Sequence, residues 1–156
     1  MPNLLPLGYE EETITADELT SDKPTGYRNG AAFDYKVGDY KRDGKNRILD
    51  CDGVESWKAW VFNCMSTQRY ACLAYDTDFG IEWDKVFAAG SHEEAESIIV
   101  RQITEAVLAD PYGRCEYVED IEIDWTAPDA VEVHAILHGL EDVTIDITAY
   151  ITKEAS

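Results

Sequence analysis

The last third of the chain alternates between apolar and polar residues with the period of two that is typical of β-strands. In the segments 117–125, 131–137 and 143–151 the odd positions other than Glu119 are apolar, and most even positions are polar. Ala127-Pro-Asp129 separates the first two segments, and Gly139-Leu-Glu-Asp142 separates the last two. Because the connections are short, the pattern predicts an antiparallel meander of three strands with one face toward solvent.

Two earlier segments have the spacing of amphipathic helices. Asp52, with Glu55 three residues later, predicts a helix that begins there and ends near Ser66-Thr67. Its apolar face comprises Val54, Trp57, Val61, Phe62 and Met65. Ser91 and Glu94 form a capping box that opens a longer helix, which Asp110-Pro111 stops. Its apolar face comprises Ala95, Ile98, Ile99, Ile103, Ala106 and Val107. Packed on the apolar face of the meander, two to three helices give an α+β fold.

The segment from Ala32 to Asp52 predicts a hairpin. Residues 33–40 and 47–51 would form its two arms, and Asp43-Gly44 is a strong turn signal between them. Four basic residues lie close to this turn: Lys41, Arg42, Lys45 and Arg47. They form either a solvated loop tip or a site for an acidic partner. Further on, the apolar run 70–75 predicts a buried strand or extended segment, and residues 76–80 predict a turn.

The first 30 residues differ from the rest. Between Met1 and Asp22 there are six acidic residues and no Lys or Arg, prolines and glycines punctuate the segment, and apolar periodicity is absent. We interpret residues 1–30 as an extended acidic arm and residues 31–156 as a single α+β domain. The arm is either disordered or lies on a partner or on its own domain.

Composition narrows the class of protein. The chain has 156 residues, of which 45% are hydrophobic, so one domain with a genuine core is expected. Its 32 acidic and 13 basic residues give a formal net charge of −19, which disfavours binding to nucleic acid or to anionic lipid. The N-terminus lacks a basic region of the secretory type, and the apolar runs are too short to span a membrane. The four cysteines are Cys51, Cys64, Cys72 and Cys115, and none of them forms a CxxC pair. We therefore expect buried free thiols and a protein of the reducing cytoplasm.

No motif of the chain indicates catalysis, a metal or a cofactor. His134 and His138 lie on a predicted strand, about 13 Å apart, which is too far for one zinc ion. Residues 76–87 do not match a calcium loop, and phosphate-binding glycine motifs are absent. The many carboxylates are explained by a solvated strand face, so we expect no enzyme. The last strand, 143–152, has one charged residue and no proline, so either its own chain covers its edge or a partner adds a strand there.

Several features occur in a characteristic order between Arg47 and Thr152. They are Gly53-Val-Glu-Ser-Trp57, Thr67-Gln-Arg-Tyr70, Asp78-Phe-Gly-Ile81, the long helix from Ser91 and three strands after Asp110. In this order the chain resembles the sheath-initiator family of contractile phage baseplates, the lysozyme-like wedge proteins, and most closely its short prophage-type branch. The family extends to the type VI secretion baseplate.

The resemblance implies a structural wedge subunit of a contractile phage tail or phage-tail-like particle. Several copies would join a six-fold assembly, first in the host cytoplasm and then in the baseplate. The implied partners are other wedge proteins, the tail sheath, and tail tube or hub proteins. The C-terminal sheet would template the first sheath ring by β-strand addition. Two other functions stay open: a muramidase, after the family's historical name, and a small acidic inhibitor of a basic partner.

The resemblance also implies interface residues. At the wedge contact they are Arg69, Phe79, Gly80 and Arg114, and on the last strand they are Thr144, Asp146, Thr148 and Tyr150. Many members carry Glu-Pro-Arg after the long helix, where this chain has Asp110-Pro-Tyr-Gly-Arg114, so the Glu is missing. Gln68 likewise replaces the usual Glu beside Arg69. The two arginines therefore either contact the wedge or form an internal ion pair.

Overall fold

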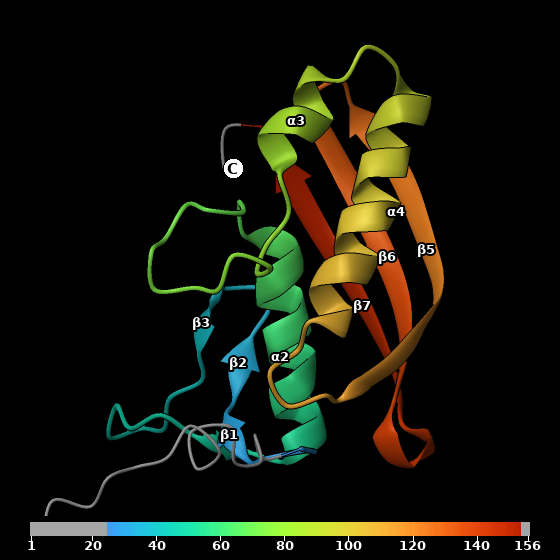
Figure 1. Cartoon of the computed structure of the whole chain (residues 1–156). Helices are drawn as coiled ribbons and strands as arrows, with labels where there is room; N and C mark the ends of the chain where they lie inside the picture. The colour runs from blue at the N-terminus through green and yellow to red at the C-terminus, as the bar shows by residue number, and fades with distance from the viewer. Residues whose placement is uncertain (1–24, 154–156) are drawn as a thin grey trace, which may run out of the picture.

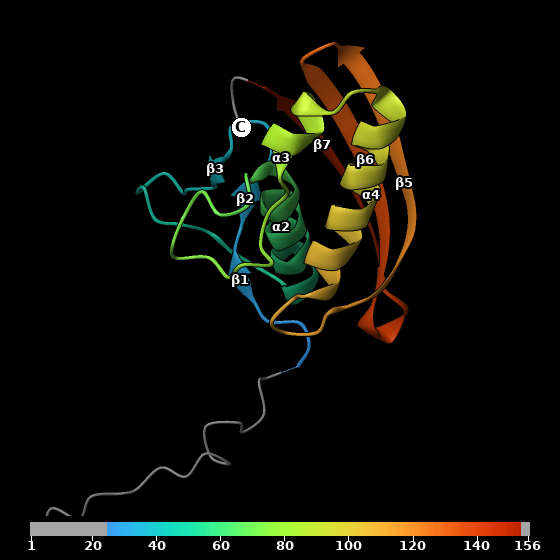
Figure 2. The same ribbon diagram turned by 45° about the horizontal axis from the view of Figure 1, so that its top comes forward.

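Helices cover one face of a three-stranded antiparallel sheet (Figures 1 and 2). This architecture comes from a computed structural model, which describes residues 25–153. The helices are α2 (Gly53–Ser66), α3 (Trp83–Ala88) and α4 (His92–Leu108), and the sheet strands are β5 (Cys115–Ala127), β6 (Ala130–Gly139) and β7 (Thr144–Thr152). Four short strands precede them: β1 (Gly30–Ala31), β2 (Phe33–Asp34), β3 (Asp39–Tyr40) and β4 (Asp50–Cys51). The predicted α+β class is confirmed.

The sheet has the predicted meander order, β5-β6-β7. The odd residues of β6 and β7 are buried beneath the helices, whereas the even residues face away from them. On β5 the expected alternation is wrong at the start of the strand, for Tyr117 and Val118. Val118 pairs with Leu137 and Asp120 pairs with Ile136, so Glu119 is an extra residue in a bulge. The bulge reverses the phase of the strand, which leaves Tyr117 half exposed and packs Val118 against the core.

Both predicted helix starts are confirmed by their caps. The Glu55 backbone N–H donates to Asp52 Oδ1 (2.9 Å), and the Glu94 N–H donates to Ser91 Oγ (3.2 Å). Each bond satisfies one of the N–H groups that the first turn of a helix leaves without an internal partner. The core between helices and sheet is centred on large, fully buried side chains, Trp57, Met65, Trp83, Ile99 and Ile103 among them.

The predicted hairpin contains an additional turn. Residues 33–40 do not form one arm, because the Asp34 carboxylate accepts bonds from the N–H groups of Lys36 and Val37, and Gly38 adopts φ +75°. This turn separates β2 from β3, which pair with each other. The turn at Asp43 does occur, and β1 and β4 pair at the base of the hairpin.

The run 70–75 is neither a buried strand nor an extended segment but mostly turns and bends, so this expectation is wrong. All six of its residues are exposed, and the Leu73 side chain is fully so. The loop is closed at its base, where the Arg69 N–H donates to the Ile81 carbonyl and the Ile81 N–H donates to the Thr67 carbonyl. With both ends fixed at the core, the intervening residues project outward and cannot reach the sheet.

The cysteines differ in environment. The thiol of Cys64 is buried, and burial raises its pKa to about 11, whereas Cys72 lies on the exposed loop, so the expectation of a buried thiol is wrong there. All four cysteines are free. Within residues 25–153, no helix is long and apolar enough to cross a membrane.

The predicted arm, residues 1–30, lies mostly outside the described residues. Its last residues are attached to the domain. The Gly26 N–H donates to the Tyr112 carbonyl (2.9 Å), and the Tyr27 hydroxyl donates to the Leu140 carbonyl (2.8 Å). The Tyr27 ring also packs against Trp57, with ring centroids 5.7 Å apart. The segment that leads into β1 is therefore fixed against both helix α2 and the sheet.

Candidate functional site

The first candidate surface is the outer edge of β7, which pairs with β6 on one side only. The Gly139 N–H donates to the Val143 carbonyl, and the Lys153 N–H donates to the Asp129 carbonyl. Both bonds join odd-numbered residues, so the odd residues of β7 direct their backbone groups toward β6. Because these groups alternate in direction along an antiparallel strand, the even residues direct theirs away from the sheet. These residues are Thr144, Asp146, Thr148 and Tyr150, and no backbone partner for them occurs within residues 25–153.

The side chains of this edge are held by β6, not by a covering segment. Thr144 Oγ1 lies 3.1 Å from His138 Nδ1, and the Asp146 carboxylate contacts His134 Nε2. The Tyr150 ring is exposed. β7 thus presents a regular row of N–H and C=O groups whose own side chains do not block access to them.

The opposite edge of the sheet differs. β5 carries the bulge at Glu119, and the Ile121 N–H donates to Asp120 Oδ1 of its neighbour (2.9 Å). A bulge and a side-chain acceptor both interrupt the row of backbone groups that an incoming strand needs. Of the two edges, only that of β7 is free of such irregularities.

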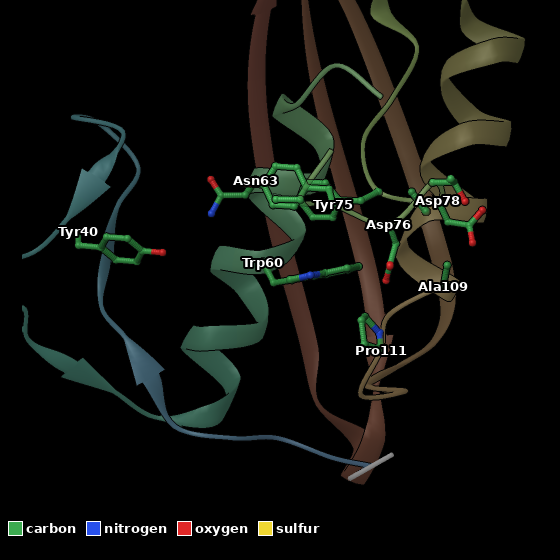
Figure 3. A pocket seen from close by; sticks show the side chains of 12 residues that line it. Tyr40, Trp60, Asn63, Tyr75, Asp76, Asp78, Ala109 and Pro111 are labelled. Atoms are coloured by element: carbon green, nitrogen blue, oxygen red, sulfur yellow. The ribbon is translucent and has the colours of Figure 1, made fainter. Parts of the chain in front are cut away.

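The second candidate surface is a pocket of about 780 Å³ on the outer side of the helical layer (Figure 3). The Trp60 ring projects into it from α2, and the loop that carries Tyr75 and Asp76 forms the opposite wall. The rings of Tyr75 and Phe79 stack with centroids 4.3 Å apart, and Trp60 meets Phe79 edge-on at 5.8 Å. The pocket therefore combines aromatic walls with carboxylates at its rim, those of Asp76 and Asp78.

Arg114 lies buried beside this pocket and is 3% exposed. Its Nε and Nη2 atoms donate to the two carboxylate oxygens of Asp110 at 2.7 and 2.9 Å, and its guanidinium lies 5.6 Å from the Trp60 ring centroid. The Asp110 carboxylate also accepts from the N–H groups of Tyr112 and Arg114. Arg114 thus forms an internal ion pair with Asp110, one of the two alternatives given for it. The place of Asp110 four residues before Arg114 was the available signal.

Arg69 closes the base of the exposed loop. Its Nε donates to the Gly80 carbonyl (3.0 Å), its Nη1 lies 3.9 Å from Glu105 Oε2, and its Nη2 is buried without a partner in the described part of the chain. Gln68, which replaces the family's usual Glu, bonds to Asp84 at the start of α3. Arg69 therefore lies inside the fold, where it positions the loop that forms one wall of the pocket.

The conformation of Gly80 is required for this closure. Its φ is +91°, and a Cβ atom there would lie 2.8 Å from the Thr67 carbonyl oxygen and 3.0 Å from the Arg69 nitrogen. We expect Gly80→Ala to lower the free energy of unfolding by about 2–3 kcal/mol, measured by urea denaturation, because backbone atoms must move to admit the methyl group. Gly44→Ala is the control, since nothing lies within 4 Å of a Cβ there. Equal stability of the two variants would contradict this role.

The structure places the predicted interface residues in two groups. Phe79 lines the pocket, and the buried Arg69, Gly80 and Arg114 lie behind its walls. Thr144, Asp146, Thr148 and Tyr150 lie along the edge of β7. In Figure 1 helix α2 lies beside β7, and Figure 3 shows Trp60 projecting from α2 into the pocket. Sequence reasoning missed the pocket itself, because its aromatic residues come from three separate segments. Among the described residues, no cluster of His, Cys, Asp or Glu side chains has the geometry of a metal site.

A family model described as contractile injection system sheath initiator matches residues 30–135, which is more than half of the chain. The match begins at β1 and ends within β6, so β7 lies beyond it. No curated protein matches the chain.

Proposed function

Because the chain belongs to the family of contractile injection system sheath initiators, we propose that it is a baseplate wedge subunit that templates the first sheath ring. The coarser role, a structural component that interacts with sheath and baseplate, follows from membership of the family. The finer proposal is that sheath strands add to β7 while the pocket beside α2 binds the wedge. Several copies would do this around a six-fold baseplate, next to tube or hub proteins.

One observation carries the sheath half of the proposal: the backbone groups of the even residues of β7 face outward without a described partner. A strand that pairs there gains main-chain hydrogen bonds, which do not depend on particular side chains. β7 contributes nine residues to such a pairing, and its ladder with β6 is regular throughout. A regular template of this length is suited to fixing the register of an added strand.

The wedge half of the proposal is supported by the apolar character of the segments around the pocket. The loop that forms one wall of the pocket carries three exposed large hydrophobic residues, Tyr70, Leu73 and Tyr75. Exposed apolar residues gathered in one region are typical of protein interfaces. In this proposal Arg69 and Arg114 act through the pocket walls that they hold, because both guanidinium groups are buried.

Capture of the tagged full chain from producing cells tests the two halves separately. We expect both sheath and wedge proteins to be identified by mass spectrometry with the unmodified chain. Leu73→Asp should lose most of the wedge proteins, since it places a charge on an exposed apolar contact, and should keep the sheath protein. Val100→Asp is the control, because Val100 is also an exposed aliphatic residue but lies on α4 away from the pocket. Loss of wedge proteins in both variants, or in neither, would contradict the assignment of the pocket.

An assay of peptidoglycan turbidity addresses the rival activity. We expect the purified chain to leave a cell-wall suspension unchanged. Clearing that is abolished by replacing one carboxylate would instead establish a muramidase and overturn the structural role.

A further inference from the structure

The tip of the hairpin between β3 and β4 carries a concentration of positive charge on a strongly acidic protein. Four of the 13 basic residues lie within seven positions, 41–47, and all four are exposed. Arg47 pairs with Asp43 at 2.9 Å. The other three, Lys41, Arg42 and Lys45, form no ion pair with any residue of 25–153. The hairpin tip therefore keeps an uncompensated positive charge.

Apolar side chains accompany these charges. Tyr40, Ile48 and Leu49 are between 41% and 46% exposed and adjoin the basic residues in sequence. Figure 1 shows this part of the chain projecting from the body of the domain, away from the sheet. A segment that complements the tip should therefore be both acidic and partly apolar.

The first 24 residues of the same chain have this composition. Their acidic residues are Glu10, Glu11, Glu12, Asp17, Glu18 and Asp22, and no basic residue precedes Lys23. Apolar residues are interspersed among them: Leu4, Leu5, Leu7, Tyr9, Ile14 and Leu19. We propose that this N-terminal segment binds the basic hairpin tip of its own chain.

The attachment of the segment favours an intramolecular contact. Residue 25 is five positions before β1, and β1 pairs with β4 at the base of the same hairpin. An extended chain spans up to about 3.3 Å per residue, so Asp17 and Glu18 can lie about 25 Å from Thr25. A short tether gives an effective concentration on the order of millimolar, which a separate acidic partner would have to match. Even a weak charge complementarity is then enough to populate the contact.

Zero-length carbodiimide coupling tests the contact in the full chain, because it joins a carboxylate to a lysine amine only where the two touch. We expect Lys41 and Lys45 to couple to acids of residues 10–22, and Lys85, an exposed lysine on α3, not to do so. Coupling should fall several-fold between about 0.1 M and 1 M NaCl, because the Debye length falls from about 10 Å to about 3 Å. In an equal mixture of ¹⁴N- and ¹⁵N-labelled chains, each cross-linked product should contain a single isotope, because both coupled residues belong to one chain. Products that join the two labels, or equal coupling of Lys85 to acids of residues 10–22 rather than to its own neighbour Glu82, would overturn the proposal.

Protease accessibility provides an independent measurement. We expect the double substitution Lys41→Gln and Lys45→Gln to speed cleavage after Glu10–Glu12 by a Glu-specific protease about two- to fivefold, because the tethered segment is then released. Lys41→Arg with Lys45→Arg keeps the charge and should retain the rate of the unmodified chain. Both pairs replace exposed side chains, so the fold is not at risk. Equal cleavage rates in all three proteins would overturn the proposal.

Discussion

Particles that carry Thr148→Pro are expected to have baseplates and tubes but little or no sheath. The Thr148 N–H faces away from β6, so proline removes a donor that an added sheath strand would use and leaves the internal ladder intact. Electron micrographs of tails from cells that produce the variant measure the length of the sheath. Circular dichroism of the purified subunit should show an unchanged fold.

Two further variants test whether the loss of an outward N–H group causes the loss of the sheath. Thr148→Ala keeps the N–H and should support a full-length sheath, because addition of a strand depends on the main chain. Asp146→Pro removes the other central outward donor and should repeat the effect of Thr148→Pro. Ile147→Pro is unsuitable, since Ile147 is buried and its backbone faces Ala135 of β6. Full-length sheath on particles that carry a folded Thr148→Pro or Asp146→Pro subunit would exclude β7 as the initiating surface.

Arg114→Ala is expected to lower the free energy of unfolding by about 3–5 kcal/mol, because it leaves the Asp110 carboxylate buried without its cationic partner. Urea denaturation of the purified chain measures the change. The chain offers a matched control, since Arg47 and Asp43 form the same kind of pair four residues apart at the surface. Arg47→Ala should cost far less, because solvent screens the exposed pair. Similar losses in the two variants would show that burial of the Arg114 pair does not determine its contribution.

The elements that sequence reasoning recovered are those encoded by local spacing. The caps at Asp52 and Ser91 and the alternation along β6 and β7 each depend on residues a few positions apart, and all occur as predicted. Tyr117 was misplaced because a single bulged residue, Glu119, changes which face its neighbours occupy. The period of the residues alone does not reveal such an insertion, since both phases look equally regular over a few positions.

The loop 70–79 and the pocket depended on contacts between distant segments. An apolar run such as 70–75 is equally suited to a strand and to a partner-binding loop, and the bonds of Arg69 and Ile81 decide between them. For the same reason Asp110 was read as a helix stop, although its carboxylate is a buried partner of Arg114. The edge of β7 was thus predictable, because it follows from the pattern of one strand. The pocket was not, because three separate segments form it.

The irregular edge of β5 has a consequence for how assembly can grow. A sheet with two straight edges can be extended at both sides, and copies of it can then chain together without limit. Here the bulge at Glu119 and the bond from the Ile121 N–H to Asp120 disrupt one side, so addition of a strand at β7 has no equivalent on the far side. In the proposed role each subunit would therefore be a terminus with a single direction of growth, because β7 is the one regular edge of the three-stranded sheet within residues 25–153.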